Sequence, residues 1–291
     1  MGNIDISDDT LAKVAGNVVL ITGGSSGIGR ATAQLCLDLG AAVVIGDLTP
    51  PNPELTVRDA EKLKFIEVNV TEWTSIRSMF EQANKWFGRI DSVFACAGVS
   101  PTTDFLDITL DESGQLAPPN LRTMDINLLG PIYTTRLAAA YMSELASQRP
   151  QGSGGSIVLA ASASSFQNFS AGDYTVTKHG VLGMIRGMGS KLEAKGIRLN
   201  AIAPSWTATG IVPAELIQSL GATVQSPEAV ARSVVLLFAD PARNSEVIYS
   251  WEGKFREVNK GEGGLLASAN AILDNADNEE RVMLKLREAQ H

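Results

Sequence analysis

A tyrosine and a lysine four residues apart, Tyr174 and Lys178, form the pair of side chains in this sequence best suited to chemistry. In a helix this spacing places both on one face. A phenol, whose ordinary pKa is about 10, is a weak base at neutral pH. A neighbouring ammonium group favours the phenolate, so that the phenol can take a proton from an alcohol or return one to a forming alkoxide. Such pairs also occur on exposed helices, so the pair needs support from its surroundings.

A glycine-rich segment at residues 22–29, TGGSSGIG, offers a second kind of chemistry. It follows a short apolar run and precedes a helical pattern. Glycines let backbone amides approach a pyrophosphate closely, and the start of a helix adds partial positive charge. The glycine spacing is G-x-x-x-G-x-G, and the segment stands where a nucleotide-binding βαβ unit needs it.

The charged residue that ends the next apolar run bears on the choice of cofactor. Asp47 ends that run, where a carboxylate can bind both ribose hydroxyls of NAD and would repel a 2′-phosphate. No lysine or arginine follows within residues 48–51. Arg30 is the one basic residue near the turn, and it lies past the last glycine. The sequence therefore favours NAD over NADP.

The elements that must position these residues follow a regular alternation. Apolar runs that predict strands stand at 17–22, 42–46, 64–68, 92–95, 156–161, 197–203 and 247–250. Patterns that predict helices stand between them at 29–39, 71–87, 122–147, 173–195 and 227–238. Continuous apolar strands joined by amphipathic helices indicate a parallel sheet that is buried on both faces. We therefore expect an α/β, doubly wound, Rossmann-like fold of about seven strands in a single domain over 1–291. Residues 101–120 form a polar insertion, and 253–291 form a charged tail with a helical pattern at 279–289.

Composition excludes several classes of function. The chain has 291 residues, is 44% hydrophobic and carries a net charge of −8, without a basic block, so neither a nucleic acid nor an anionic membrane is an expected partner. No apolar stretch is long enough to span a bilayer, and the polar, acidic start lacks the features of a signal peptide. Two cysteines and two histidines, widely separated, predict no disulfide framework and no metal site. A cytoplasmic setting is the expectation.

Taken together and in this order, the glycine turn, the segment MDINLLG around Asn127, the strand SIVLAAS and the Tyr174/Lys178 pair resemble the short-chain dehydrogenase/reductase family. The resemblance covers residues 15–250. It implies a Rossmann-like fold and a nicotinamide cofactor, and it carries little information about the substrate.

The resemblance also implies roles for individual residues. Ser162 matches the serine that hydrogen-bonds the substrate oxygen, with Ser164 as an alternative because the gap to Tyr174 is one residue shorter than usual. Tyr174 matches the acid/base, Lys178 the residue that binds the nicotinamide ribose, and Asn127 the asparagine that holds a water in a proton relay. The residues implied at the cofactor are Gly23, Ser25, Ser26, Gly27, Ile28, Gly29, Asp47, Asn69, Val70, Ala97, Gly98, Tyr174, Lys178, Pro204, Thr207 and Thr209.

Three positions depart from the family pattern. Cys96 stands where the family usually has an asparagine that steadies the central sheet, and we interpret it as a buried structural thiol. Asn69 stands where an aspartate usually contacts the adenine, and an amide can still form a hydrogen bond there. Ser205 replaces the usual glycine after Pro204.

The expected substrate pocket lies beyond the carboxyl ends of the strands. Its candidate walls are Val99, Ser100, Ala163, Ser164, Phe169, Trp206, Ile211 and Val212. These residues are mostly apolar, and no arginine is expected near a carboxylate or phosphate of the substrate. We therefore predict an uncharged, fairly hydrophobic secondary alcohol or ketone. The segment between Gly210 and Gly221 is a candidate lid.

The insertion and the tail resemble those of NAD-dependent fungal members that act in secondary metabolism. Family members commonly pair through the helices equivalent to 122–147 and 174–195, so a homodimer or homotetramer is expected. Two other functions stay open: isomerisation or cyclisation without net redox on the same scaffold, and NAD binding without catalysis.

Overall fold

The computed structural model describes residues 3–100, 104–143, 154–210, 213–273, 281–283 and 285–286. Its strands are β1 (Val18–Thr22), β2 (Ala42–Asp47), β3 (Leu63–Glu67), β4 (Ser92–Ala95), β5 (Gly155–Ala160), β6 (Ile197–Pro204), β7 (Val247–Trp251) and β8 (Lys254–Glu257). Its α-helices are α1 (Asp8–Leu11), α2 (Gly27–Asp38), α3 (Trp73–Phe87), α4 (Arg122–Met124), α5 (Gly130–Ser143), α6 (Gly172–Glu193), α7 (Ala214–Ser219), α8 (Pro227–Ala239) and α9 (Leu265–Ile272).

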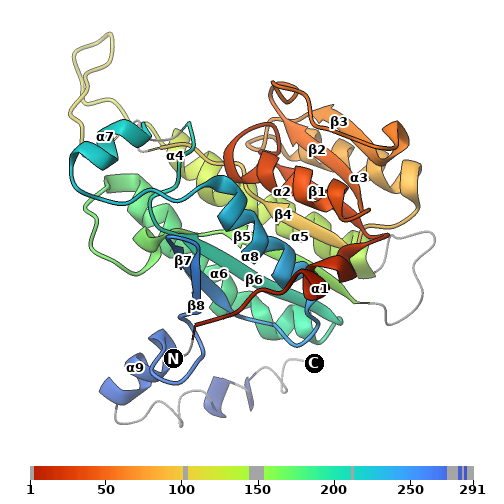
Figure 1. The fold of residues 1–291 in the computed structure, drawn as a ribbon. Helices are drawn as coiled ribbons and strands as arrows, with labels where there is room; N and C mark the ends of the chain where they lie inside the picture. Colours follow the sequence, from red (N-terminus) through yellow and green to blue (C-terminus); the bar gives the residue numbers. More distant parts are fainter. Residues whose placement is uncertain are drawn as a thin grey trace.

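The strands form one sheet in the order β3-β2-β1-β4-β5-β6-β7-β8. Strands β1 to β7 pair in parallel, and β8 pairs antiparallel with β7. The order reverses between β1 and β4, which is the switch point where doubly wound folds bind ligands. The predicted α/β, doubly wound fold is confirmed, with helices on both faces of the sheet (Figure 1).

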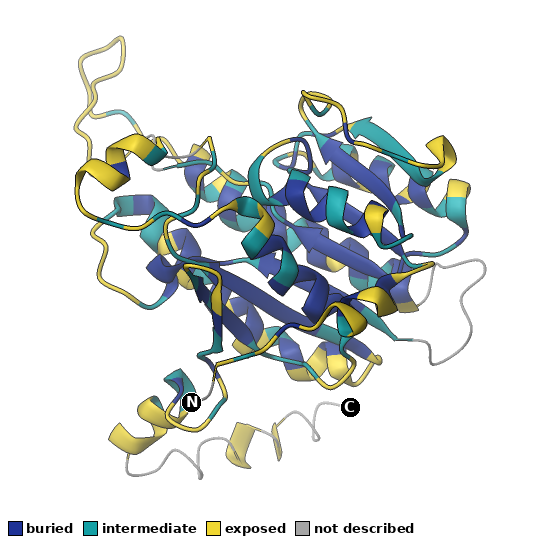
Figure 2. Cartoon of the chain, in the orientation of Figure 1, coloured by how far each residue is buried: buried dark blue, intermediate teal, exposed yellow. Residues whose placement is uncertain are grey.

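Two hydrophobic cores lie on the two faces of this sheet. One packs α3, α5 and α6 against it, and the other packs α2 and α8. All five residues of β1 are buried because both of its faces are covered. Figure 2 shows the sheet as the most deeply buried layer, with α7, α9 and the insertion exposed.

The predicted helix at 122–147 is not one regular helix. A π-helical turn at Asp125–Leu129 separates α4 from α5. Pro131 explains part of this, because it has no N–H to donate to the carbonyl of Asn127 four residues earlier. Such π turns frequently lie at functional sites. Residues 144–147 lie outside the described part of the chain.

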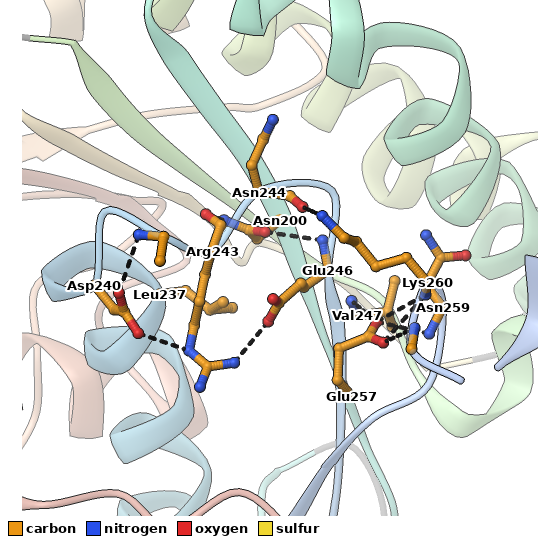
Figure 3. Close-up of polar contacts among 12 residues, drawn as sticks. Asn200, Leu237, Asp240, Arg243, Asn244, Glu246, Val247, Glu257, Asn259 and Lys260 are labelled. Atoms are coloured by element: carbon orange, nitrogen blue, oxygen red, sulfur yellow. Dashed lines mark hydrogen bonds and ion pairs between the residues drawn. The ribbon is translucent and has the colours of Figure 1, made fainter. Parts of the chain in front are cut away.

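The region predicted as a tail from residue 253 begins instead with an ordered strand, so the sheet has eight strands rather than about seven. The Glu257 carboxylate fixes this edge by accepting hydrogen bonds from the backbone N–H groups of Val247, Asn259, Lys260 and Gly261, at 2.6–3.2 Å (Figure 3). Beyond it, α9 leads away from the sheet. Most of the helix predicted at 279–289 lies outside the described residues.

The predicted insertion is a surface excursion between β4 and α4. An antiparallel bridge between Leu110 and Leu116 closes it into a narrow loop. It projects from the body of the molecule above α7 (Figure 1). Residues 101–103 lie outside the described part of the chain.

Candidate active site

A cavity of about 770 Å³ lies at the carboxyl ends of the parallel strands. It is lined by the ends of β1, β2, β4, β5 and β6 and by the turns that follow them. The cavity therefore spans the switch point of the sheet, where the sequence places the ligand. Most of the predicted site residues line it: Gly23, Ser26, Gly27, Ile28, Asp47, Asn69, Val70, Ala97, Gly98, Val99, Ser100, Ser162, Phe169, Tyr174, Lys178, Pro204, Trp206, Thr207 and Thr209.

The glycine turn forms one wall of this cavity. Gly23 and Gly27 have φ angles of +71° and +49°, which side-chain-bearing residues rarely adopt. A Cβ on Gly23 would stand 2.6 Å from the Ala97 Cα, so the turn packs directly on the segment after β4. The N-terminus of α2 then opens into the cavity at Gly27 and Ile28. This cradle fits a pyrophosphate.

The carboxylate of Asp47 is held in a fixed orientation at the end of β2. Its Oδ2 accepts a hydrogen bond from the Ser25 N–H at 3.0 Å, and its Oδ1 accepts one from the Leu48 N–H at 2.7 Å. Each oxygen keeps a further lone pair for a ribose hydroxyl. Ser25 itself is buried and does not line the cavity, because its hydroxyl donates to the Thr49 carbonyl at 2.6 Å. Ser25 thus contributes by orienting Asp47.

Arg30, the basic residue nearest the turn, points away from the cavity. Its guanidinium donates to the Pro53 carbonyl at 3.1 and 3.3 Å, and it is not part of the cavity lining. The ribose end of the cavity is therefore lined by a carboxylate without this arginine. Arg30 is therefore not placed to bind a ribose 2′-phosphate.

Tyr174 and Lys178 lie one turn apart on α6 and both line the cavity. The Lys178 Nζ lies 5.4 Å from the centroid of the Tyr174 ring. The lysine side chain is buried and donates to the Ala160 carbonyl at the end of β5, at 2.7 Å. Its ammonium has two further protons. This hydrogen bond points the charge at the cavity beside the phenol.

The structure separates the two candidate serines. Ser162 lines the cavity, and its Oγ accepts a hydrogen bond from the Ser164 N–H at 3.1 Å, which leaves the hydroxyl proton available to a ligand. Ser164 is fully buried, and its hydroxyl pairs with the Thr175 hydroxyl at 3.0 Å. Ala163 is also buried, and neither Ala163 nor Ser164 lines the cavity. The end of β5 thus presents Ser162 alone of these three.

Asn127 and Gly29 also lie outside the cavity lining. The Asn127 side chain is buried, and its amide exchanges two hydrogen bonds with the backbone of Val99, at 2.8 and 3.0 Å. It therefore supports the segment after β4 from below. Gly29 is buried against the carbonyl of Gly23, and a Cβ there would overlap it. Both residues shape the walls without facing the ligand.

Aromatic side chains close the other end of the cavity. The rings of Phe169 and Trp206 lie parallel, with centroids 6.0 Å apart and an interplanar angle of 9°. Gln225 is joined to Ala208 and Trp206 by backbone hydrogen bonds of 2.9 and 3.0 Å. Ile217, on α7 between these residues, also lines the cavity, whereas Ile211 and Val212 lie outside the described residues.

One charged residue of the lining was missed by the sequence. Arg122 at the start of α4 lines the cavity, together with Ile126 one turn later. No arginine was predicted among the residues that line this cavity. The available signal was its position at the start of the helix predicted at 122–147, five residues before Asn127.

Cys36 is buried and Cys96 is partly buried. Both are free, and burial raises the pKa of the Cys36 thiol and of the Cys96 thiol to about 12. Cys96 lines the cavity beside the glycine turn. A thiol with such a pKa is a poor nucleophile at neutral pH, in keeping with a structural role.

Two features are absent from the residues that the structure describes. None of the helices there is long and apolar enough to cross a membrane. No group of three or more histidine, cysteine, aspartate or glutamate side chains is placed there to hold a metal ion.

Comparisons with known proteins agree with this geometry. A family model described as short chain dehydrogenase matches residues 17–218. The short-chain dehydrogenase/reductase ascJ of Acremonium egyptiacum is 43% identical over 276 residues, which cover 94% of this chain and 90% of the relative. The mitochondrial (−)-isopiperitenol/(−)-carveol dehydrogenase of Mentha piperita is 32% identical, over 80% of this chain and 90% of the relative. The crystal structure of gox2181 shares the fold, with a TM-score of 0.62, 23% identity and coverage of 82% of this chain and 96% of that one.

Proposed function

Because this chain belongs to the short-chain dehydrogenase/reductase family of oxidoreductases, we propose that it interconverts an uncharged, largely apolar secondary alcohol and its ketone with NAD(H). The observation that carries the proposal is the shared cavity. It brings the glycine turn, Asp47, Ser162 and the Tyr174/Lys178 pair to one surface from four separate segments of the chain.

Each residue has a distinct task in this proposal. The nicotinamide ring, when bound, accepts or returns the hydride. Ser162 donates a hydrogen bond from its free hydroxyl to the substrate oxygen, while the Tyr174 phenolate takes the proton of the alcohol. As hydride leaves the carbon and the proton leaves the oxygen, the C=O bond forms and the charges balance. Lys178 stabilises the phenolate through its ammonium group.

The same residues support the choice of NAD. The Asp47 carboxylate is preoriented for ribose hydroxyls, and Arg30 is engaged by Pro53. We infer that the enzyme works mainly as an alcohol dehydrogenase that reduces NAD, since NAD preference suits oxidation of the alcohol.

The apolar end of the cavity supports the substrate class. Phe169, Trp206 and Ile217 offer flat and aliphatic surfaces without a charge. The relative from Mentha piperita is named as a dehydrogenase of isopiperitenol and carveol. We therefore propose cyclic terpenoid alcohols as the first compounds to test, in keeping with a place in secondary metabolism.

The test follows the absorbance of reduced nicotinamide while apolar secondary alcohols are offered with NAD or NADP. We expect turnover with NAD, and a loss of about 10²–10⁴-fold in kcat for Tyr174→Phe, the range that acid–base catalysis contributes. Tyr133→Phe is the matched control, because Tyr133 lies outside the cavity with its ring against Trp73. If Tyr174→Phe keeps most of the activity, the mechanism is wrong.

Two alternatives give different outcomes in the same assay. Tight NAD binding with a changed product and no net change in nicotinamide absorbance would support isomerisation or cyclisation. Tight NAD binding without any turnover would support a regulator.

The setting and assembly belong to the same proposal. Two free cysteines suit a reducing, cytoplasmic environment. We propose a homodimer or homotetramer that pairs through α5 and α6. A monomer mass in light scattering would contradict this assembly.

A further inference from the structure

Arg122 is a cation in the cavity that the mechanism above does not use. Its side chain is exposed and lines the cavity. Within the described ranges, its guanidinium forms no hydrogen bond or ion pair with another residue. Arg89 and Arg198, in contrast, are engaged by a carboxylate and by three backbone carbonyls. The Arg122 guanidinium therefore has its donors and its flat face available to a ligand.

The helical stretch that follows shows which way Arg122 faces. Arg122, Ile126 and Gly130 are spaced by four residues and so lie on one side of this stretch. At Gly130 that side packs on Val70, since a Cβ there would stand 3.2 Å from the Val70 Cβ. Leu128 points the other way, toward Gly180 of α6. Arg122 thus lies on the side of this stretch that packs on Val70 at Gly130, and Val70 follows β3 in the chain.

The order of the strands tells which half of a dinucleotide lies there. Asp47 ends β2, next to β3, so the ribose that it binds belongs to the adenosine half. Tyr174, Lys178 and Pro204 stand on the other side of the switch point, by β5 and β6. The side of the cavity that Arg122 lines is therefore the adenosine side.

The chemistry on that side suits a flat, neutral ring. Leu48 follows Asp47 and lines the same cavity, although 61% of its surface is exposed in the absence of a ligand. A planar guanidinium stacks on an aromatic face and remains charged at any working pH. We propose that Arg122 binds the adenine ring of the nucleotide, with its guanidinium against the ring and Leu48 as the apolar wall. This inference rests on the proposed function.

The experiment measures binding rather than turnover. Titration calorimetry of the full chain with ADP-ribose, NAD and nicotinamide mononucleotide separates the two halves of the cofactor. We expect Arg122→Met to weaken ADP-ribose and NAD binding about fivefold, equivalent to ~1 kcal/mol, and to leave the mononucleotide unchanged. Arg136→Met is the matched control, because Arg136 is exposed on α5 outside the cavity and should change none of the three.

Arg122→Lys distinguishes the ring from the phosphates. A lysine keeps the charge but lacks the planar face, so we expect it to recover less than half of the lost affinity. Full recovery by lysine would assign Arg122 to the pyrophosphate and overturn the proposal. An unchanged ADP-ribose affinity in Arg122→Met would also overturn the proposal, whether or not the KM for the alcohol rises. A wild type that binds neither ADP-ribose nor NAD would contradict the proposed function itself, and this inference with it.

Discussion

The two serines after β5 allow a prediction that separates catalysis from stability. Ser162→Ala removes the hydroxyl that faces the cavity, and Ser164→Ala removes one that pairs with Thr175 beneath it. Loss of one preorganised donor to a developing oxyanion costs about 10²–10³-fold in kcat, or ~3–4 kcal/mol. We therefore expect that loss in Ser162→Ala and a change of less than about threefold in Ser164→Ala, because the latter hydroxyl does not reach the ligand.

The stability of the two variants provides the control. Ser162 Oγ accepts a hydrogen bond from the Ser164 N–H at 3.1 Å, and Ser164 Oγ pairs with Thr175 at 3.0 Å. Each substitution thus removes one hydrogen bond, which contributes about 1 kcal/mol to the free energy of unfolding. Urea unfolding should show similar losses for both, so that stability does not account for the difference in rate.

Initial rates under saturating NAD, with the same alcohol, complete the assay. A large loss of kcat in Ser164→Ala together with a small one in Ser162→Ala would refute the assignment of the serine. Equal losses of kcat in both would indicate that the turn itself, rather than one hydroxyl, sustains the rate.

Three further predictions follow from other parts of the structure. Glu257→Gln should lower the free energy of unfolding by about 2 kcal/mol, because an amide NH₂ would face backbone N–H groups that now donate to the carboxylate. Glu252→Gln is the control on an exposed turn of the same hairpin, and it should change the free energy of unfolding by less than about 0.5 kcal/mol. Urea titration measures both. Asp47→Asn should lower the ratio of the NADP dissociation constant to the NAD dissociation constant by about tenfold, because the charge that repels a 2′-phosphate is gone. An unchanged ratio in calorimetry would contradict the role given to Asp47. The pKa of about 12 for Cys36 and Cys96 leaves roughly one thiolate in 10⁴ at pH 8. Iodoacetamide should therefore label the native chain about 10³-fold more slowly than an ordinary thiol, and the rate should rise tenfold per pH unit. Rapid labelling at pH 8, measured by mass spectrometry, would contradict this prediction.

Local spacing was sufficient for the parts of the site that lie within one element or its immediate turn. The glycines of residues 22–29 are required by the turn that they form, as the φ angles of Gly23 and Gly27 show. Tyr174 and Lys178 share a face because they stand one helical turn apart on α6. Asp47 ends β2 because the apolar run before it ends there.

Contacts between segments that are distant in the chain could not be predicted from the sequence. The eighth strand was hidden in a charged stretch, because Lys254–Glu257 becomes a strand only through pairing with β7 and through the backbone N–H groups that Glu257 accepts. Asn127 lies in the π-helical turn at Asp125–Leu129, and its side chain is bonded to Val99 outside the cavity lining.

The sequence by itself determined the order of strands and helices, the phosphate turn and the Tyr174/Lys178 pair, because each depends on the spacing of neighbouring residues. Only the tertiary structure decided that Ser162 rather than Ser164 faces the cavity, and that Arg122 lines it. The physical reason is that packing against distant residues sets the direction of a side chain in a loop or at the start of a helix. For Ser164 that is Thr175, and for the face of Arg122 it is Val70 under Gly130.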